Sequence, residues 1–235
     1  MIKKIVVTGG SGRFGNILKK VNNNFNIYFP KKSKLNIENY KSIEKYLKKI
    51  KPNYFVHCAA LSRPMDIHDL NIVKSINTNI IGTCNVVKAC EKFNIKLIYF
   101  STNYVYPKKK GLYKETDPVF PFNNYGWSKL GGEAAVQMYK NSLILRICMT
   151  EKPFAHKKAF YNVKSNFIFH DDVTKILFKL INLKGILNVG GPVQSIYKFA
   201  KKYNQNIKKS KCKIKNIPLS SVMNISKLKK KIKKW

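Results

Sequence analysis

Three side chains whose types and spacing could move a proton lie in two nearby stretches of the chain. The apolar run at residues 96–100 ends in Ser101 and Thr102, and a later helical stretch places Tyr125 and Lys129 four residues apart on one helix face. A hydroxyl, a phenol and an ammonium brought together can pass a proton to or from an alcohol or a ketone. Thr102, Tyr125 and Lys129 are therefore the catalytic candidates.

The spacing of the Tyr125–Lys129 pair is weak support alone, because 13 Tyr and 43 Lys make chance pairs common. Only Tyr125 lies on a helix that follows a strand ending in Ser-Thr. A free phenol has a pKa of ~10, and an ammonium within ~4–6 Å can lower it. We expect Lys129 to lower the Tyr125 pKa and to hold a nicotinamide ribose, and Thr102 to hydrogen-bond the reacting oxygen.

A glycine-rich segment, Thr8-Gly-Gly-Ser-Gly-Arg-Phe-Gly15, joins the first expected strand to the first helix. Glycines at 9, 12 and 15 allow a tight turn, a close approach of the backbone to a pyrophosphate and close helix packing. A purely structural turn is the alternative, but the position after the first strand favours a dinucleotide site. The predicted cofactor-binding residues here are Gly9, Ser11, Gly12, Arg13, Phe14 and Gly15. With the catalytic candidates, this loop indicates a nicotinamide-dependent oxidoreductase.

The second strand ends without the acidic residue that usually binds the ribose of NAD. Residues 28–33 contain no acid, and Lys31 and Lys32 could instead neutralise a 2′-phosphate. A basic pair can also arise by chance in a chain so rich in lysine. NADP(H) is therefore favoured, and NAD(H) is the alternative cofactor.

The charge of the chain is unusual, with 46 Lys plus Arg against 11 Asp plus Glu and a net charge of +35. Such a field attracts polyanions. Only three of the cations are Arg, the residue favoured for bidentate phosphate and base contacts. Lys, Asn and Ile share A/T-rich codons, so we interpret the charge mainly as drift on a solvated surface. No nucleic-acid partner is expected, and attraction of anionic substrates is the further alternative.

The remaining composition indicates a globular protein of the cytoplasm. Five cysteines without CxxC spacing are expected to be buried free thiols, and the four histidines have no metal-ligand spacing. We see no signal peptide and no apolar run of transmembrane length, so neither a membrane nor a metal is expected.

Alternating strand and helix signals predict an α/β fold: a Rossmann-type doubly wound parallel sheet with helices on both faces. Residues 1–150 would form the NAD(P)-binding domain. Residues 151–235 would form a small, shortened C-terminal substrate lobe, with parts of 166–192 packing back on the sheet. We also predict a short third strand over residues 34–37 and one long helix over 71–93.

The lysine-rich tail from residue 208 onward could be a nucleic-acid arm. Interleaved apolar residues instead favour a strand and a helix packed on the main domain; they are Ile214, Ile217, Leu219, Ile225 and Leu228.

Several ordered motifs together carry a family resemblance over nearly the whole chain. Besides the glycine loop they include His57-Cys-Ala-Ala60, Asn79-x-x-Gly-Thr83, Ser101-Thr-Asn-Tyr-Val-Tyr106, Tyr125-Gly-x-Ser-Lys-Leu-Gly-Gly-Glu133 and Leu145-Arg146. The chain resembles the extended short-chain dehydrogenase/reductase family, and within it the dTDP-4-dehydrorhamnose reductases and their shorter relatives. Sugar-nucleotide dehydratases of that family follow the Thr with Asp-Glu, whereas this chain has Asn103-Tyr104.

The resemblance implies further binding residues. Ala59, Ala60 and Asn79 would contact the cofactor, although a structural helix-internal amide is an equal alternative for Asn79. The predicted substrate-binding residues are Arg63, Thr102, Asn103, Tyr104 and Arg146. His68 is a further polar candidate in the loop at 61–68, and a merely solvated histidine is its alternative.

The implied function is NAD(P)H-dependent reduction of a nucleotide-linked 4-keto-6-deoxy sugar, with Tyr125 as the proton donor. A sugar-nucleotide epimerase of the same family and a non-catalytic, NAD(P)-binding regulatory subunit are the alternatives. The segment between Arg146 and Asp171 is shorter than the family norm, which leaves the identity of the sugar open. The expected partner is the nucleotide-sugar substrate, and a homodimer is possible.

Overall fold

A six-stranded parallel sheet forms the centre of the protein. The computed structural model describes residues 2–107, 111–154, 156–213, 219–220 and 222–232. In the order β10-β5-β4-β3-β1-β2, every neighbouring pair is parallel. The strands are β1 (Lys4–Thr8), β2 (Asn26–Tyr28), β3 (Tyr54–His57), β4 (Lys96–Thr102), β5 (Ser142–Ile147) and β10 (Gly185–Val189). The predicted fold class is confirmed.

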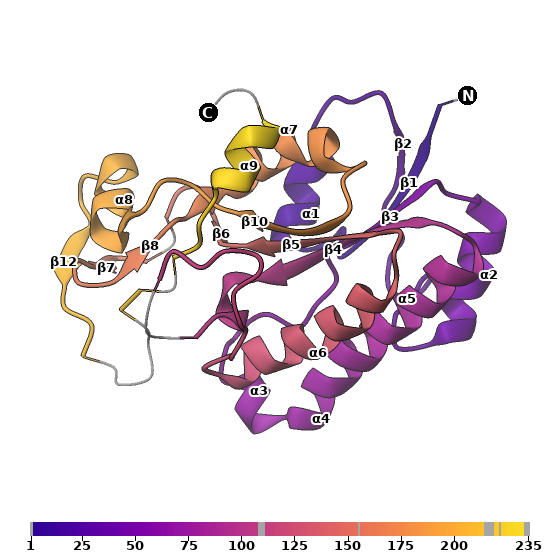
Figure 1. Cartoon of the computed structure of the whole chain (residues 1–235), viewed down its shortest axis with the longest axis horizontal. Helices are drawn as coiled ribbons and strands as arrows, with labels where there is room; N and C mark the ends of the chain where they lie inside the picture. The colour runs from indigo at the N-terminus through magenta and orange to yellow at the C-terminus, as the bar shows by residue number, and fades with distance from the viewer. Residues whose placement is uncertain (1, 108–110, 155, 214–218, 221, 233–235) are drawn as a thin grey trace.

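Helices cover both faces of this sheet (Figure 1). One face carries α2 (Tyr40–Ile50), α5 (Gly82–Lys92) and α6 (Asn124–Met138), and the other carries α1 (Arg13–Leu18), α7 (His170–Leu180) and α9 (Ser226–Lys231). Successive strand residues point to opposite faces. Leu97 accordingly joins the core beneath α2 and α5, whereas Ile98 joins the core beneath α7. All seven residues of β4 are buried, as a central parallel strand requires.

The strand order creates a topological switch point beside β1. The chain leaves β1 for β2 on one side of it and then crosses to β3 on the other. Ligands of open α/β sheets bind in the crevice outside the carboxyl ends of the strands at such a point. The glycine loop that follows Thr8 and the segment that follows His57 both begin there.

Two local predictions need correction. Residues 32–34 form a turn, and no strand forms over residues 34–37. Leu35 and Ile37 are apolar because both are buried against the core beneath α2 and α5, and pairing in a sheet does not explain them. The expected long helix over 71–93 is helical but not uniform, with α4 (Ile72–Ser75), a π-helical turn at Ile76–Ile81 and then α5.

A second, smaller set of elements lies at one end of the sheet (Figure 1). It holds α8 (Ile196–Tyr203) and three small two-stranded pairings. These pair β6 (Met149–Thr150) with β9 (Ile168–Phe169), β7 (Lys158–Phe160) with β12 (Lys208–Ser210), and β8 (Lys164–Ser165) with β11 (Gln194–Ser195). Phe154, Phe169 and Phe199 form much of its apolar core.

The tail returns to the main sheet. Leu228 of α9 is fully buried in the core that includes Leu187 of β10, which confirms the packed helix expected there. Ile214 and Ile217 lie outside the described residues. The five cysteines are free; Cys90, Cys148 and Cys212 are buried, as predicted, whereas Cys58 and Cys84 are only half-buried.

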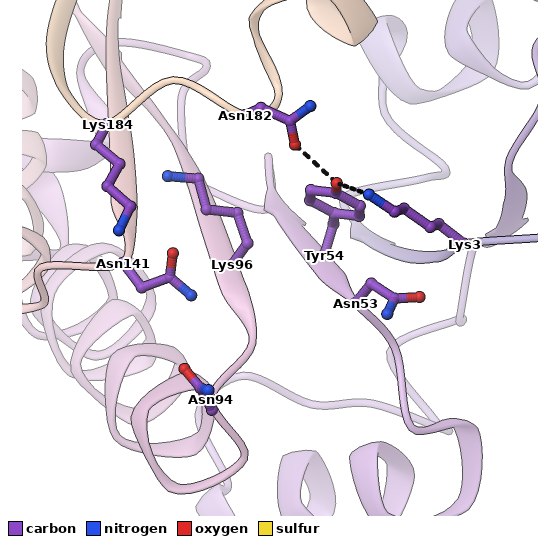
Figure 2. Close-up of a pocket in the computed structure, with 8 residues that line it drawn as sticks. All are labelled: Lys3, Asn53, Tyr54, Asn94, Lys96, Asn141, Asn182 and Lys184. Atoms are coloured by element: carbon purple, nitrogen blue, oxygen red, sulfur yellow. Dashed lines mark hydrogen bonds between the residues drawn. The ribbon is translucent and has the colours of Figure 1, made fainter.

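The two ends of the sheet differ in character. The carboxyl ends of the strands carry the motif residues, whereas a hollow lined by lysine and asparagine lies at the opposite ends (Figure 2). Within the described parts of the chain, no helix combines the length and the apolar character needed to cross a bilayer.

Candidate active site

The glycine loop is shaped by close backbone contacts. Gly9 has a φ of 75°, and a Cβ there would lie 2.8 Å from the Ala59 backbone nitrogen. A Cβ at Gly15 would lie 2.5 Å from the Gly9 carbonyl oxygen. Any side chain at either position would therefore push the loop away from β3 or from α1. This bare turn fits the pyrophosphate of a dinucleotide, because it lets the backbone approach a ligand closely.

The predicted cofactor residues of the loop divide by exposure. Ser11, Gly12 and Arg13 are exposed, whereas Phe14 and Gly15 are buried. The Phe14 ring packs against the Phe100 ring with centroids 4.9 Å apart. Phe14 could therefore face a cofactor only with its backbone.

Asn79 joins three segments around the site. Its Oδ1 accepts a hydrogen bond from the Leu61 backbone N–H at 2.8 Å, and its Nδ2 donates to the Leu61 carbonyl at 2.9 Å and to Ser128 Oγ at 2.8 Å. These bonds tie the loop after Ala59 and Ala60 to α6. The contacts support the structural alternative for Asn79, whose amide lies in the π-helical turn. Such turns are frequent at functional sites.

Two of the three catalytic candidates touch. Thr102 ends β4, and its side chain lies close enough to the phenol of Tyr125, in the first turn of α6, to favour the ionised form of that phenol. The Tyr104 backbone N–H donates to Thr102 Oγ1 at 3.3 Å, at the start of a short 3₁₀ turn over Asn103–Val105. The end of the central strand and the start of α6 thus bring a hydroxyl and a phenol together.

The Tyr125 phenol is not activated in the way we expected. Burial raises its pKa to about 12, while the neighbouring Thr102 side chain and the positive charge of Arg63 act in the opposite direction. The prediction that Lys129 lowers the pKa of Tyr125 is wrong for this structure, since Lys129 is not among the groups that shift that pKa. Its ammonium instead lies over the Tyr99 ring, 4.2 Å from the ring centroid. Among the described groups, Arg63 is the cation that favours the ionised phenol.

Lys129 is nonetheless placed for chemistry. Its side chain is buried, and burial lowers its pKa to about 7, against the opposing influence of Cys58 and Glu133. Cys58 follows β3, so the ammonium lies between α6 and the switch point. A lysine whose pKa is near neutrality can exchange a proton readily.

His68 lies closer to the candidate active site than we expected from the sequence. It lies on the short helix α3 (Ile67–Leu70), is 1% exposed, and its Nδ1 is 2.7 Å from Ser75 Oγ. Its ring packs against the ring of Tyr125. The alternative of a solvated loop histidine is therefore wrong. Its Nε2 is buried and has no hydrogen-bond partner, and burial lowers its pKa.

A glutamate that the sequence did not single out links the cofactor and substrate candidates. Glu151 Oε1 lies 2.6 Å from Arg13 Nη1 and 2.9 Å from Arg63 Nη1. These contacts join the glycine loop, the loop after β3 and the segment after β6. The sequence offered one hint toward Glu151, which is that acidic residues are rare in this chain, at 11 of 235. His170 lies close enough for the charges of all three residues to influence its pKa, which burial lowers.

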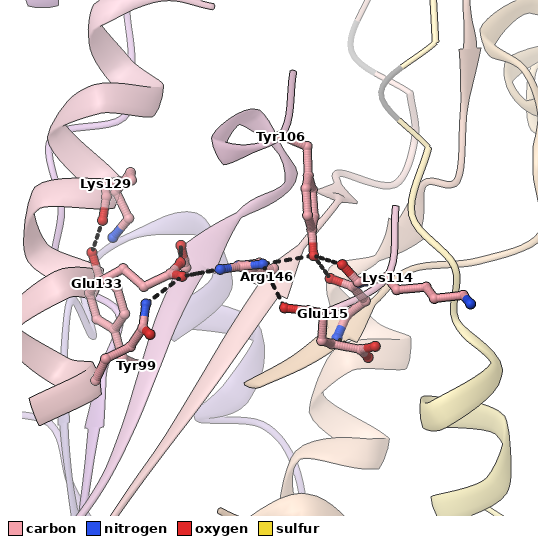
Figure 3. A network of polar contacts seen from close by, with 10 residues as sticks. Tyr99, Tyr106, Lys114, Glu115, Lys129, Glu133 and Arg146 are labelled. Carbon is pink, nitrogen blue, oxygen red and sulfur yellow. Dashed lines mark hydrogen bonds and ion pairs between the residues drawn. The ribbon is translucent and has the colours of Figure 1, made fainter. Parts of the chain in front are cut away.

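Arg146 lies deeper than a substrate-binding residue would need (Figure 3). It is 2% exposed and its Nη2 lies 2.6 Å from Glu133 Oε1. Its Nη1 donates to the Tyr106 hydroxyl at 2.9 Å, and Ser101 Oγ donates to the other carboxylate oxygen of Glu133 at 2.6 Å. This network joins β4, β5 and α6 beneath Thr102. It gives the substrate-binding prediction for Arg146 no support and assigns the guanidinium a structural role.

The other candidates lie around the same edge of the sheet. Tyr104 contacts the Tyr125 ring edge-on with centroids 5.8 Å apart, and Asn103 is buried. Lys31 and Lys32 are exposed after β2, and Lys32 Nζ lies 3.4 Å from Glu38 Oε1.

Comparisons with known proteins agree with this architecture. The chain is 28% identical over 202 residues to the dTDP-4-dehydrorhamnose reductase of Aggregatibacter actinomycetemcomitans. The aligned segment covers 82% of this chain and 63% of that protein. It is 30% identical over 155 residues to methionine adenosyltransferase 2 subunit beta of Danio rerio, covering 62% of this chain and 47% of that protein. The chain thus spans less than two thirds of the length of these relatives.

Solved structures show the same fold. The dTDP-4-dehydrorhamnose reductase of Bacillus anthracis, in complex with NADP, superposes with a TM-score of 0.87 at 24% identity, covering 97% of this chain and 91% of that one. The Bordetella bronchiseptica enzyme WbmG, in complex with NAD, superposes with a TM-score of 0.79 at 20% identity, covering 99% and 88%. The model of the RmlD substrate binding domain matches residues 3–160, well over half of the 235-residue chain. By this match the chain belongs to the RmlD substrate-binding domain family.

Proposed function

We propose that this protein is an NAD(P)H-dependent reductase of a nucleotide-linked 4-keto-6-deoxy sugar. The observation that carries the proposal is the placement of the Thr102 side chain beside the Tyr125 phenol at the carboxyl end of β4. It brings a proton donor and a second hydroxyl together beside the glycine loop. The relatives named as reductases support the same chemistry.

The residues around the glycine loop would hold the cofactor. The bare backbone at Gly9 and Gly15 leaves room for a pyrophosphate, and Arg13 stands exposed beside it. A bound reduced nicotinamide would supply the hydride for the keto carbon. Both NADP and NAD are bound by solved relatives. Lys31 and Lys32 lead us to favour NADP(H) for this chain.

Tyr125 would donate its proton to the oxygen of the sugar ketone as that oxygen gains negative charge. Thr102 would hydrogen-bond the same oxygen and hold it in place. The raised pKa of Tyr125 suits this direction of reaction, because a phenol with a pKa of about 12 carries its proton at neutral pH. Lys129, buried and with a pKa of about 7, would return a proton to the phenol.

The residues around Arg63 and the lobe at 151–235 would bind the nucleotide sugar. Arg63 is half-exposed and acts electrostatically on Tyr125, so an anionic substrate that contacts it lies near the proton donor. A diphosphate supplies binding energy remote from the reacting carbonyl, and that energy can orient the ketone.

Absorbance at 340 nm tests the proposal. The purified protein should oxidise NADPH with a nucleotide-diphospho-4-keto-6-deoxy sugar and not with the matched free keto sugar. Tyr125→Phe should abolish most turnover, and Tyr46→Phe, which alters a tyrosine of α2, should not. Comparable turnover of the two sugars would contradict the anchoring role of the diphosphate.

A second function is favoured by one observation, the similarity to methionine adenosyltransferase 2 subunit beta. In that case the chain would bind a dinucleotide and act as a subunit of another enzyme. Cofactor binding without turnover of any keto sugar would favour this alternative.

A further inference from the structure

A hollow of about 250 Å³ lies at the end of the sheet opposite the catalytic candidates (Figure 2). Its eight lining residues stand at or just before the starts of β1, β3, β4, β5 and β10. They comprise three lysines, four asparagines and one tyrosine. Parallel α/β sheets bind their ligands at the other ends of the strands, so this hollow does not belong to the site described above.

The floor of the hollow contains a buried ammonium group. Lys96 is the first residue of β4 and is 7% exposed, and its buried Nζ has no hydrogen-bond partner among the residues that the structure describes. Lys3, on the rim, differs because its Nζ donates to Tyr54 Oη at 3.3 Å. The Tyr54 hydroxyl in turn donates to Asn182 Oδ1 at 2.8 Å (Figure 2). A buried charge without a partner is costly, and an anion bound beside this ammonium would lower that cost.

None of the eight described residues around the hollow is acidic. Burial and, to a smaller extent, the positive charge of Lys184 together lower the pKa of Lys96 to about 8. Arg146, the buried cation of the active-site network, is by contrast paired with Glu133. Solvated surface lysines produced by drift do not explain Lys96, because its side chain is not solvated.

We propose that this hollow is a binding site for a phosphate-sized anion, held by the ammonium groups of Lys96, Lys3 and Lys184 and by the side-chain amides around them. Ammonium and amide N–H groups are the donors that such an anion requires. The volume lies below the ~300–1,000 Å³ of pockets for drug-sized ligands, so a single phosphoryl group suits it. Inorganic phosphate and a phosphomonoester such as a nucleoside monophosphate share this chemistry.

The site is distant from the proposed cofactor. Lys96 and Thr102 are the first and last residues of the seven-residue β4. At ~3.3 Å per residue, the two ends of this strand are about 20 Å apart. Variants at Lys96 and at Arg13 can therefore separate the two sites.

Thermal unfolding in sodium phosphate and in sodium chloride of equal ionic strength, at pH 7, tests the proposal. The unmodified protein should melt several degrees higher in phosphate, because a ligand of the native state stabilises it by mass action. Lys96→Met should lose this difference and should melt higher than the unmodified protein in chloride, since it removes the unpaired charge. Lys45→Met, at an exposed position on α2, and Arg13→Met should keep the phosphate effect.

Titration calorimetry with phosphate and with adenosine monophosphate completes the test. Comparable binding of the two, weakened at least tenfold by Lys184→Met, would identify the phosphoryl group as the recognised chemistry; this rim variant also serves if Lys96→Met does not fold. Loss of the phosphate effect in Arg13→Met with retention in Lys96→Met would place the anion at the glycine loop and overturn the proposal. Equal melting in the two salts, or binding of the monophosphate alone, would overturn it as well.

Discussion

The ring of His68 packs against the ring of Tyr125, with centroids 5.2 Å apart and planes inclined at 52°. The residue after His68 also contacts the residue before Tyr125, since Asn124 Nδ2 donates to Asp69 Oδ1 at 2.6 Å. Two consecutive residues of α3 thus hold two consecutive residues of α6. The phenol is positioned from this side by His68 and from the other by Thr102 and Tyr104.

The first prediction concerns this contact. His68→Ala should lower kcat by about tenfold or more, because removing the ring lets the phenol move out of line. His68→Phe keeps a ring of similar size and should retain most of the activity. Steady-state assays, with the melting temperature and the NADPH Kd as controls, distinguish misplacement from unfolding. An unaltered kcat in His68→Ala would show that the packing is not needed.

Tyr125 and Lys129 should separate proton transfer from cofactor binding. Tyr125→Phe should lower kcat roughly 10²–10⁴-fold and leave the NADPH Kd nearly unchanged, because the phenol serves proton transfer. Lys129→Ala should weaken both, since we assign it to the ribose and to the proton path. Fluorescence titration of NADPH measures the binding. Loss of binding in Tyr125→Phe would mean that the residue is misassigned.

Cofactor preference should depend on the lysines after β2. Changing Lys31 and Lys32 together to Ala should remove a preference for NADPH over NADH, because a 2′-phosphate would lose two ammonium groups, and the effect should weaken with salt. Glu38 pairs with Lys32, so Glu38→Gln should strengthen the preference. Dissociation constants for the two cofactors measure it. Equal constants in the unmodified protein would refute the assignment.

The buried pair of Glu133 and Arg146 should dominate local stability. Glu133→Gln leaves the guanidinium without its carboxylate and should lower the free energy of unfolding by about 3–5 kcal/mol. Asp172→Asn breaks the exposed pair with Lys175 and should cost about 0–1 kcal/mol. Urea denaturation compares the two. Similar losses would argue against a structural role for the network.

Acid should destabilise the fold through its buried histidines. Burial lowers the pKa of His57 to about 3 from the ordinary 6.5. Between these values the unfolded chain binds a proton that the folded chain does not, so stability falls as the pH falls from about 6.5 to about 3. His57→Asn should flatten this dependence by up to about 1.4 kcal/mol per pH unit. Urea midpoints across this range measure it, and an unchanged slope would exclude His57 as a source.

The fold was predictable because its strands correspond to short apolar runs in the sequence. The central strand β4 could be recognised because its apolar run over residues 96–100 ends in Ser-Thr. The expected strand over 34–37 failed for a physical reason, since alternating Leu35 and Ile37 is equally compatible with a turn whose apolar side chains both reach the core.

The site was predictable where local spacing determines it. Thr102 and Tyr125 meet because a strand end and a helix start are fixed by the fold. The contacts of His68 and Glu151 depend on segments far apart in the chain, so no local pattern reveals them. Arg146 was recognised from its motif, but its role was not. The sequence did not show that Arg146 pairs with Glu133 in the core and does not face a ligand.

The ion pairs of Glu151 with Arg13 and Arg63 would couple ligand binding at one arginine to ligand binding at the other. Its single carboxylate pairs with both Arg13 and Arg63, so a phosphate that competes for one guanidinium alters the ion pair with the other. For a reductase, the dinucleotide would approach Arg13 and the anionic substrate Arg63. Thermodynamic linkage is reciprocal, so whatever factor the first ligand imposes on the affinity of the second is returned unchanged. If the two arginines bind these two ligands, the shared carboxylate of Glu151 would couple the occupancy of one site to that of the other.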